Sequence, residues 1–225
     1  MQRSGRMRGR QGDGDTGSGD TRSRILEAAT THFAEKGYEG ARTQAIADDA
    51  GVNRAMLYYH FKDKEHLYRE MLTGHFQVIF SQVFPTFVRP DLDSRDRVLK
   101  VVDAYIGFLR KNPQIRSLML YELAAGGPHL SHVVQTLLAS IPGVDVEHVF
   151  TQIGTMMGRG DVQQGDPRQL FLHILSLTIF PFAARPLLET IWQLGPGEYD
   201  ALMADRVEAI ADLFDHGLFT SKEAQ

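Results

Sequence analysis

The stretch TQAIADDAGVNRAMLYYHFKDKEHL, residues 43–67, decides the fold of this 225-residue chain. It predicts two short helices, 44–50 and 53–60, and Asn53 is a residue type that caps a helix N-terminus. Gly51 suits the tight turn between the two helices. Two short helices joined by a four-residue turn that contains glycine form the frame of a helix-turn-helix motif.

The second of these helices carries an unusual surface for a merely structural element. Asn53 and Arg54 can donate hydrogen bonds to bases or phosphates, and Met56 can contact a thymine methyl group. The consecutive rings at 58–60 point in different directions on a helix, so at least one leaves the core and can bond a phosphate oxygen. The helix could lie in the major groove of DNA. A small helical subdomain with aromatic packing is the alternative.

The flanking sequence continues the helical pattern. Apolar residues recur at three- and four-residue spacing from Thr21, and Gly37 is a natural helix stop. Thr43 is expected to cap the helix that follows. Asp63 is expected to cap a fourth helix that runs from Lys64 to about residue 84, before Pro85. Further helices are expected at about 95–111, 113–125, 129–140, 145–158, 167–184, 186–194 and 198–216. No strand pattern is present, and the predicted class is all-α.

Composition limits the function without identifying it. The net charge is −4, and residues 1–70 hold 12 Lys and Arg against 11 Asp and Glu, so charge alone does not indicate DNA binding. The chain has no cysteine, which excludes disulfides and thiolate chemistry. No nucleophile elbow, phosphate loop or HExxH motif is present, and we expect no enzyme. His129 and His132 are a weak metal pair, and no cofactor or metal is expected.

Two further segments bear on the compartment and the domain boundaries. Residues 1–20 hold six Gly, four Arg and no Ile, Leu, Val or Phe, which predicts a disordered tail that could touch DNA as a basic arm. The nearly apolar run 170–184 is too short to cross a bilayer, which needs about 20 residues, so we interpret it as a buried helix. No signal peptide is visible. We expect a cytoplasmic protein with no membrane partner.

Residues 21–72 resemble the N-terminal domain of the TetR/AcrR family of transcriptional regulators. The resemblance rests on ILEAATTHFAEKGYEG (25–40) and on the 43–67 stretch quoted above, including the Ala-Gly-Val turn and the run 57–61. Ala55 departs from the family, which often has Gly there. The resemblance implies a helix-turn-helix DNA-binding domain at 21–72 and an effector-binding and dimerisation domain at 73–225.

The family likeness also implies site residues. Those expected to hold the DNA backbone or read bases are Arg42, Thr43, Gln44, Asn53, Arg54, Ala55, Met56, Tyr58, Tyr59, His60 and Lys64. The expected partners are a near-palindromic double-stranded operator, a small-molecule effector and a second copy of the chain. The expected function is that of a ligand-responsive repressor, which the small molecule releases from its operator. Activation, which uses the same contacts, and a ligand-independent DNA-binding role are the alternatives.

The C-terminal part gives less specific signals. Residues 166–192 are apolar on more than one face, which favours their burial against a second copy of the chain in a dimer. The last helix, 198–216, could complete this dimer interface. Candidate ligand residues are the large or polar groups on mainly apolar helices: Phe76, Phe80, Tyr105, Phe108, Met119, Tyr121, Glu122, Met156 and His173. Their aromatic character suggests a hydrophobic effector, with cationic and polyaromatic molecules as options.

Overall fold

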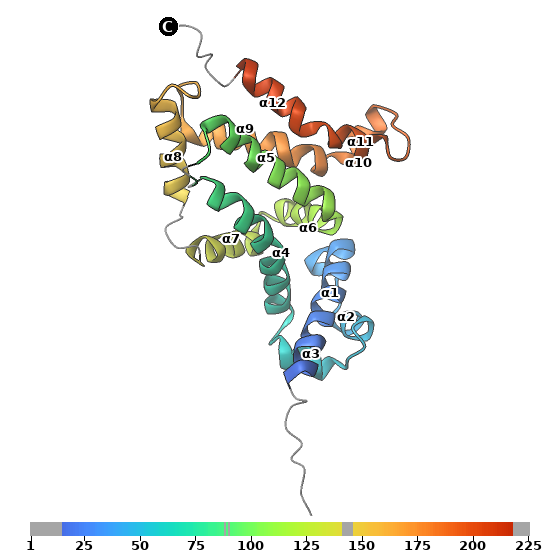
Figure 1. The fold of residues 1–225 in the computed structure, drawn as a ribbon. Coiled ribbons are helices and arrows are strands. Elements are labelled where there is room, and N and C mark those ends of the chain that lie inside the picture. Colours follow the sequence, from blue (N-terminus) through green and yellow to red (C-terminus); the bar gives the residue numbers. More distant parts are fainter. Residues whose placement is uncertain (1–14, 88, 90, 141–145, 218–225) are drawn as a thin grey trace, which may run out of the picture. The chain divides into compact units, whose positions relative to one another are not determined.

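The structure is a computed structural model that describes residues 15–87, 89, 91–140 and 146–217. Within these residues the chain is helical and has no extended strand, so the all-α prediction is confirmed (Figure 1). The chain divides into two compact units, Met1–Met71 and Leu72–Gln225. The first unit ends at Met71, one residue before the end of the expected DNA-binding domain at residue 72.

The first unit is built from two long and two short helices around one aromatic core. Phe33 and Tyr68 pack edge to face with ring centroids 4.7 Å apart, and Tyr38 lies 5.0 Å from Tyr68. His32 Nε2 lies 2.6 Å from a carboxylate oxygen of Asp49 and ties two helices together. The helices of this unit are α1 (Asp15–Gly40), α2 (Thr43–Asp49), α3 (Arg54–His60) and the first part of α4 (Lys64–Phe87).

Helix α1 begins earlier than the sequence pattern suggests. The composition of residues 15–20 predicts part of a disordered tail, but these residues form the first turns of α1. The Ser23 hydroxyl donates to the Gly19 carbonyl, and Arg24 pairs with Asp20 at 3.4 Å. Such local bonds support a segment that has little apolar surface. The rest of the expected tail, residues 1–14, lies outside the described residues.

The second unit packs its helices around α9. Helices α5, α6, α8 and α10 all contact α9, and α12 packs on α5. The core positions include Val102, Ile106, Leu118 and Ile174. The helices of this unit after α4 are α5 (Ser94–Lys111), α6 (Pro113–Ala124), α7 (Pro128–Ser140), α8 (Val146–Gly158), α9 (Pro167–Ala183), α10 (Arg185–Ile191), α11 (Glu198–Ala204) and α12 (Arg206–Gly217).

Two prolines of this unit lie inside helices and do not end them. Pro85, which was expected to follow the end of α4, lies inside it, and Pro181 lies inside the last turn of α9. Proline has no N–H, so the carbonyl four residues earlier, that of Leu177, loses its helical partner. The Arg206 guanidinium donates to this carbonyl at 3.2 Å, and Tyr199 donates to the Pro181 carbonyl at 2.5 Å. Neighbouring helices thus satisfy the backbone around the proline.

Helix α9 is only partly the buried helix that its sequence suggested. Leu170, Ile174 and Phe182 are buried, whereas Leu172 and Phe180 are more than half exposed. No single described helix is both long and apolar enough to span a membrane, and α9 passes such a test only together with α10, across a 70° bend. One expected helix, 198–216, is divided at Asp205 into α11 and α12.

Candidate nucleic-acid interface and ligand cavity

Helix α3 is fixed in the first unit by its ends and by one buried side chain. The Asn53 side chain caps the helix as expected, because its Oδ1 accepts from the Met56 backbone N–H at 2.8 Å. Gly51 supplies the left-handed backbone of the preceding turn, with φ of 65°. Leu57 is fully buried. The opposite face of α3 is therefore presented to solvent.

The residues expected to contact DNA divide into an exposed set and a half-buried set. Tyr59 is 80% exposed, more than any other large hydrophobic side chain among the described residues, and Met56 is 42% exposed. We call the exposed set the reading face; it comprises Arg42, Gln44, Asn53, Arg54, Ala55, Met56 and Tyr59. The half-buried set comprises Thr43, Tyr58, His60 and Lys64.

The Tyr58 hydroxyl joins α2 to α3. It lies 3.1 Å from the Thr43 hydroxyl and accepts from the Arg54 guanidinium at 3.2 Å. The same guanidinium lies 5.3 Å from the centre of the Tyr58 ring. The hydrogen bonds with Thr43 and then Arg54 lower the pKa of Tyr58 from its ordinary value. Thr43 thus bonds to α3 through Tyr58 and does not cap α2, whose N-cap position is occupied by Arg42.

Lys64 also has an internal partner. Its Nζ donates to the Glu39 carbonyl at 3.2 Å and lies 4.7 Å from the centre of the Tyr38 ring. The ammonium group is therefore held beside the first turn of α4, where the N-terminal end of a helix attracts anions. Asp63 caps this helix as expected, accepting from the His66 backbone N–H at 2.7 Å.

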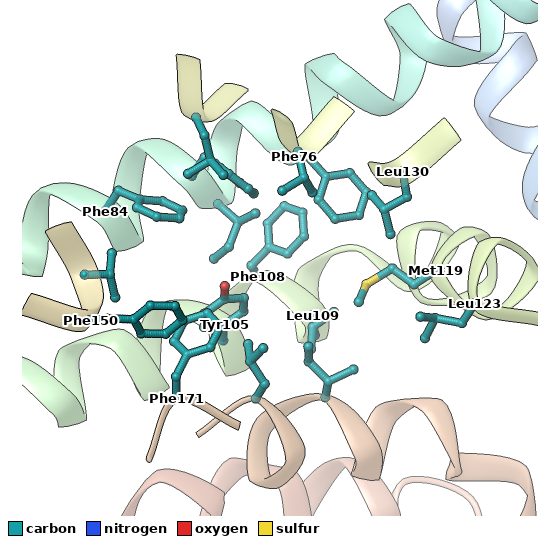
Figure 2. A pocket seen from close by; sticks show the side chains of 17 residues that line it. Phe76, Phe84, Tyr105, Phe108, Leu109, Met119, Leu123, Leu130, Phe150 and Phe171 are labelled. Atoms are coloured by element: carbon teal, nitrogen blue, oxygen red, sulfur yellow. The ribbon is translucent and has the colours of Figure 1, made fainter. Parts of the chain in front are cut away.

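The second unit contains an apolar cavity of about 340 Å³ (Figure 2). This volume is at the lower end of the ~300–1,000 Å³ typical of small-molecule sites. Helices α4 to α9 all contribute to its wall. The lining residues are Phe76, Ile79, Phe80, Phe84, Tyr105, Phe108, Leu109, Met119, Leu123, Leu130, Val134, Leu138, Val149, Phe150, Phe171, Leu175 and Ile179.

Five of the nine candidate ligand residues lie in this wall: Phe76, Phe80, Tyr105, Phe108 and Met119. The other four lie elsewhere. Tyr121 and His173 are exposed, and Met156 is buried outside the wall. Phe84 was missed, although it follows Phe76 and Phe80 at four-residue spacing on α4 and could have been found from that stripe.

Glu122 has a structural role instead of a place in the cavity wall. Its side chain is 2% exposed, and its Oε2 accepts from the backbone N–H groups of His129 and Leu130 at 3.1 and 2.9 Å. These are first-turn donors of α7 that have no partner within the helix. The carboxylate therefore caps α7, which carries Leu130, Val134 and Leu138 to the cavity.

Two further features of the described residues concern metal binding and exposed apolar surface. No group of three or more His, Cys, Asp or Glu residues there could hold a metal ion. The part of the chain after residue 166 exposes large apolar side chains to solvent on the isolated chain. These are Leu172, Phe180, Leu187, Ile191, Trp192, Leu202 and Leu213.

Comparison with known sequences gives one family description and several regulators. The family described as "Bacterial regulatory proteins, tetR family" matches residues 25–71. The transcriptional activator FasR of Mycolicibacterium smegmatis is 35% identical over 95 residues, which cover 42% of this chain and 43% of FasR. The repressor KstR2 of Rhodococcus jostii is 36% identical over 83 residues, or 37% and 40% of the two chains. These two matches therefore span less than half of either relative.

Longer matches have lower identity. The transcriptional repressor NicS of Pseudomonas putida is 28% identical over 201 residues, covering 88% of this chain and 92% of NicS. Among solved structures, a linker-substituted mutant of HlyIIR has a TM-score of 0.65 at 22% identity, covering 92% and 100% of the two chains. The regulator SCO4942 of Streptomyces coelicolor has a TM-score of 0.64 at 17% identity, covering 88% and 98%. The likenesses to these two solved structures concern the fold alone.

Proposed function

The chain belongs to the TetR family of bacterial DNA-binding transcriptional regulators. We propose that it is a repressor and that a molecule bound in its cavity controls its affinity for DNA. Its relatives are regulators and not enzymes, as the sequence led us to expect. One observation carries the proposal. Helix α4 is continuous from Lys64 to Phe87, with Tyr68 in the core of the DNA-binding unit and Phe76 and Phe80 in the cavity wall.

The DNA end of the mechanism is the reading face of α3. We propose that the helix enters the major groove with Arg54 and Met56 at base edges, because both side chains are exposed near its N-terminus. Tyr58 and Lys64 bind phosphates, since a hydroxyl and an ammonium group held beside helix N-termini are suited to anions. Phosphate contacts position the helix, and base contacts give it sequence preference.

The operator requires two copies of the chain. The exposed apolar side chains of α9, α10 and α12, among them Phe180 and Leu213, would be covered in an isologous dimer. Such a dimer binds a near-palindromic operator with its two α3 helices about 35 Å apart, one turn of DNA. Phe180→Glu should then convert the dimer to monomers in sedimentation. Leu120→Glu, which also adds a charge at an exposed apolar position but on α6, should not.

The effector end is the cavity of the second unit. A molecule that fits the cavity better in one position of α4 than in another shifts the population toward that position. Usual allosteric coupling is about 1–3 kcal/mol, which weakens operator binding roughly 5- to 150-fold. We expect the protein to act in the cytoplasm, where its DNA lies.

Fluorescence anisotropy with the DNA beside the chain's own gene tests this proposal. Binding should be tighter than to random DNA, fall with added salt, and reach two protomers per site. Lys64→Ala should weaken binding to every sequence and reduce the salt dependence, whereas Arg54→Ala should flatten the preference between operator variants. Equal loss on operator and random DNA for Arg54→Ala would refute its base-reading role.

Activation is the second candidate, because FasR is named an activator whereas KstR2 and NicS are named repressors. Both roles use the same DNA contacts and differ in where the operator lies. Transcript levels of the neighbouring genes with and without the protein separate them. A rise on its removal supports repression, and a fall supports activation.

A further inference from the structure

The cavity wall offers no charge to a bound molecule. Of the 17 side chains that line it, 16 are aliphatic, thioether or phenylalanine groups, and Tyr105 alone has a hydroxyl. Several charged groups of this unit lie together outside the cavity. A separate, polar cleft is lined by Arg110, Lys111, Arg116, Arg185 and Asp200. An ion that entered the apolar cavity would lose its hydration without gaining a counter-charge, which is strongly unfavourable.

The Tyr105 hydroxyl points into this cavity (Figure 2). Among the described residues no group forms a hydrogen bond or ion pair with it. Burial raises the pKa of Tyr105 to about 12, so the hydroxyl keeps its proton at any physiological pH and can donate it. The hydroxyl is the one polar side-chain group of this wall, and an oxygen of a bound molecule could accept a hydrogen bond from it.

We propose that the effector is an uncharged, largely hydrocarbon molecule with one accepting oxygen, such as a ketone or an ester, that accepts a hydrogen bond from Tyr105. This inference rests on the proposed function of the cavity as the effector site. It excludes the cationic effectors that aromatic side chains alone would allow. The ring of Phe108 and its neighbours surround the hydrocarbon part, and Tyr105 fixes its orientation.

Three small compounds with a shared diphenyl frame test the proposal. Benzophenone has an accepting carbonyl, diphenylmethane has a methylene in its place, and diphenylacetate adds a carboxylate. Each is titrated against the full chain in competition with N-phenylnaphthylamine, a neutral dye that fluoresces in apolar sites. The variants are Tyr105→Phe, which removes only the hydroxyl, and Tyr121→Phe, the same change at an exposed site outside the wall.

The expected pattern is a change in ratio. Tyr105→Phe should weaken benzophenone about three- to tenfold, the usual worth of one neutral hydrogen bond, and should leave diphenylmethane unchanged or tighter. Tyr121→Phe should change neither. Diphenylacetate should need at least ~100-fold higher concentration than benzophenone to displace the dye.

Several results would overturn the proposal. One is an equal effect of Tyr105→Phe on ketone and hydrocarbon, and another is displacement by diphenylacetate at concentrations close to those of benzophenone. Failure of the neutral compounds, the dye included, to enter the cavity would also overturn it. Operator binding is measured in parallel with the same compounds. Ketone binding that depends on Tyr105 but leaves operator binding unchanged would keep this inference and refute the coupling of the cavity to DNA.

Discussion

Removing the Tyr58 hydroxyl should disturb the reading helix without unfolding it. Tyr58→Phe deletes the atom that meets the Thr43 hydroxyl at 3.1 Å and the Arg54 guanidinium at 3.2 Å. Each such bond contributes a net ~0.5–1.5 kcal/mol, and the half-exposed position of Tyr58 favours the low end. We expect operator binding to weaken by about 1–2 kcal/mol, or roughly 5- to 30-fold. The free energy of unfolding should change by less than ~1 kcal/mol.

A double-mutant cycle with Thr43→Val isolates the bond between the two hydroxyls. Thr43→Val alone should weaken operator binding by ~0.5–1 kcal/mol, and adding it to Tyr58→Phe should cause almost no further loss. Binding is measured by anisotropy on one operator at one salt concentration, and folding is checked by urea unfolding. The Thr43 bond lowers the pKa of Tyr58, so Thr43→Val should raise that pKa in an ultraviolet titration.

Additive losses in the cycle would refute this reasoning. They would mean that Thr43 and Tyr58 act on DNA independently and that their contact contributes nothing. An unchanged pKa of Tyr58 in Thr43→Val would refute it as well, because the hydrogen bond is the largest cause of the lowered value.

Three further predictions concern stability and are read from urea unfolding. Glu122→Ala leaves two first-turn donors of α7 without an acceptor and should lower the unfolding free energy by about 1–3 kcal/mol, whereas Glu122→Gln keeps an acceptor and should lose less; equal losses would contradict the capping role. Gly51→Ala places a side chain at φ of 65° and should cost about 1–2 kcal/mol, while Gly107→Ala, inside α5 with no atom near the added carbon, should stabilise; the reverse order would contradict the turn geometry. Burial lowers the pKa of His75 below its ordinary 6.5, so the unfolded chain binds a proton more readily than the folded chain does. The free energy of unfolding should therefore fall as the pH drops through and below 6.5. His75→Gln should reduce that fall, and an unchanged pH profile in this variant would contradict the role of His75.

The helix-turn-helix was predictable because its signals are local. Asn53 caps α3 and Gly51 takes the left-handed turn, as their residue types indicate. Thr43 was predicted as a cap and instead bonds Tyr58, fifteen residues away. Whether a threonine hydroxyl turns to its own helix or to another depends on how the two helices pack, which spacing along one helix does not contain.

The second unit was less predictable because its helices are apolar on several faces. The sequence could not say which face of α9 meets the cavity, and it gave no sign that Glu122 would cap α7 across a turn. Pro181 lies inside α9, where its missing N–H leaves the Leu177 carbonyl without a helical partner. That carbonyl is satisfied by Arg206, a partner 29 residues further along the chain. Long-range partners of this kind are determined by packing and not by local spacing.

The most direct test of the account is a selection of DNA fragments from a random-sequence pool by the purified full-length chain. We predict enrichment of a near-palindromic sequence whose two half-sites lie one turn of DNA apart, and loss of the preference at a specific position in each half-site with Arg54→Ala. Recovery of fragments with no shared sequence, or an unchanged sequence preference in Arg54→Ala, would contradict the central claim that α3 reads the operator.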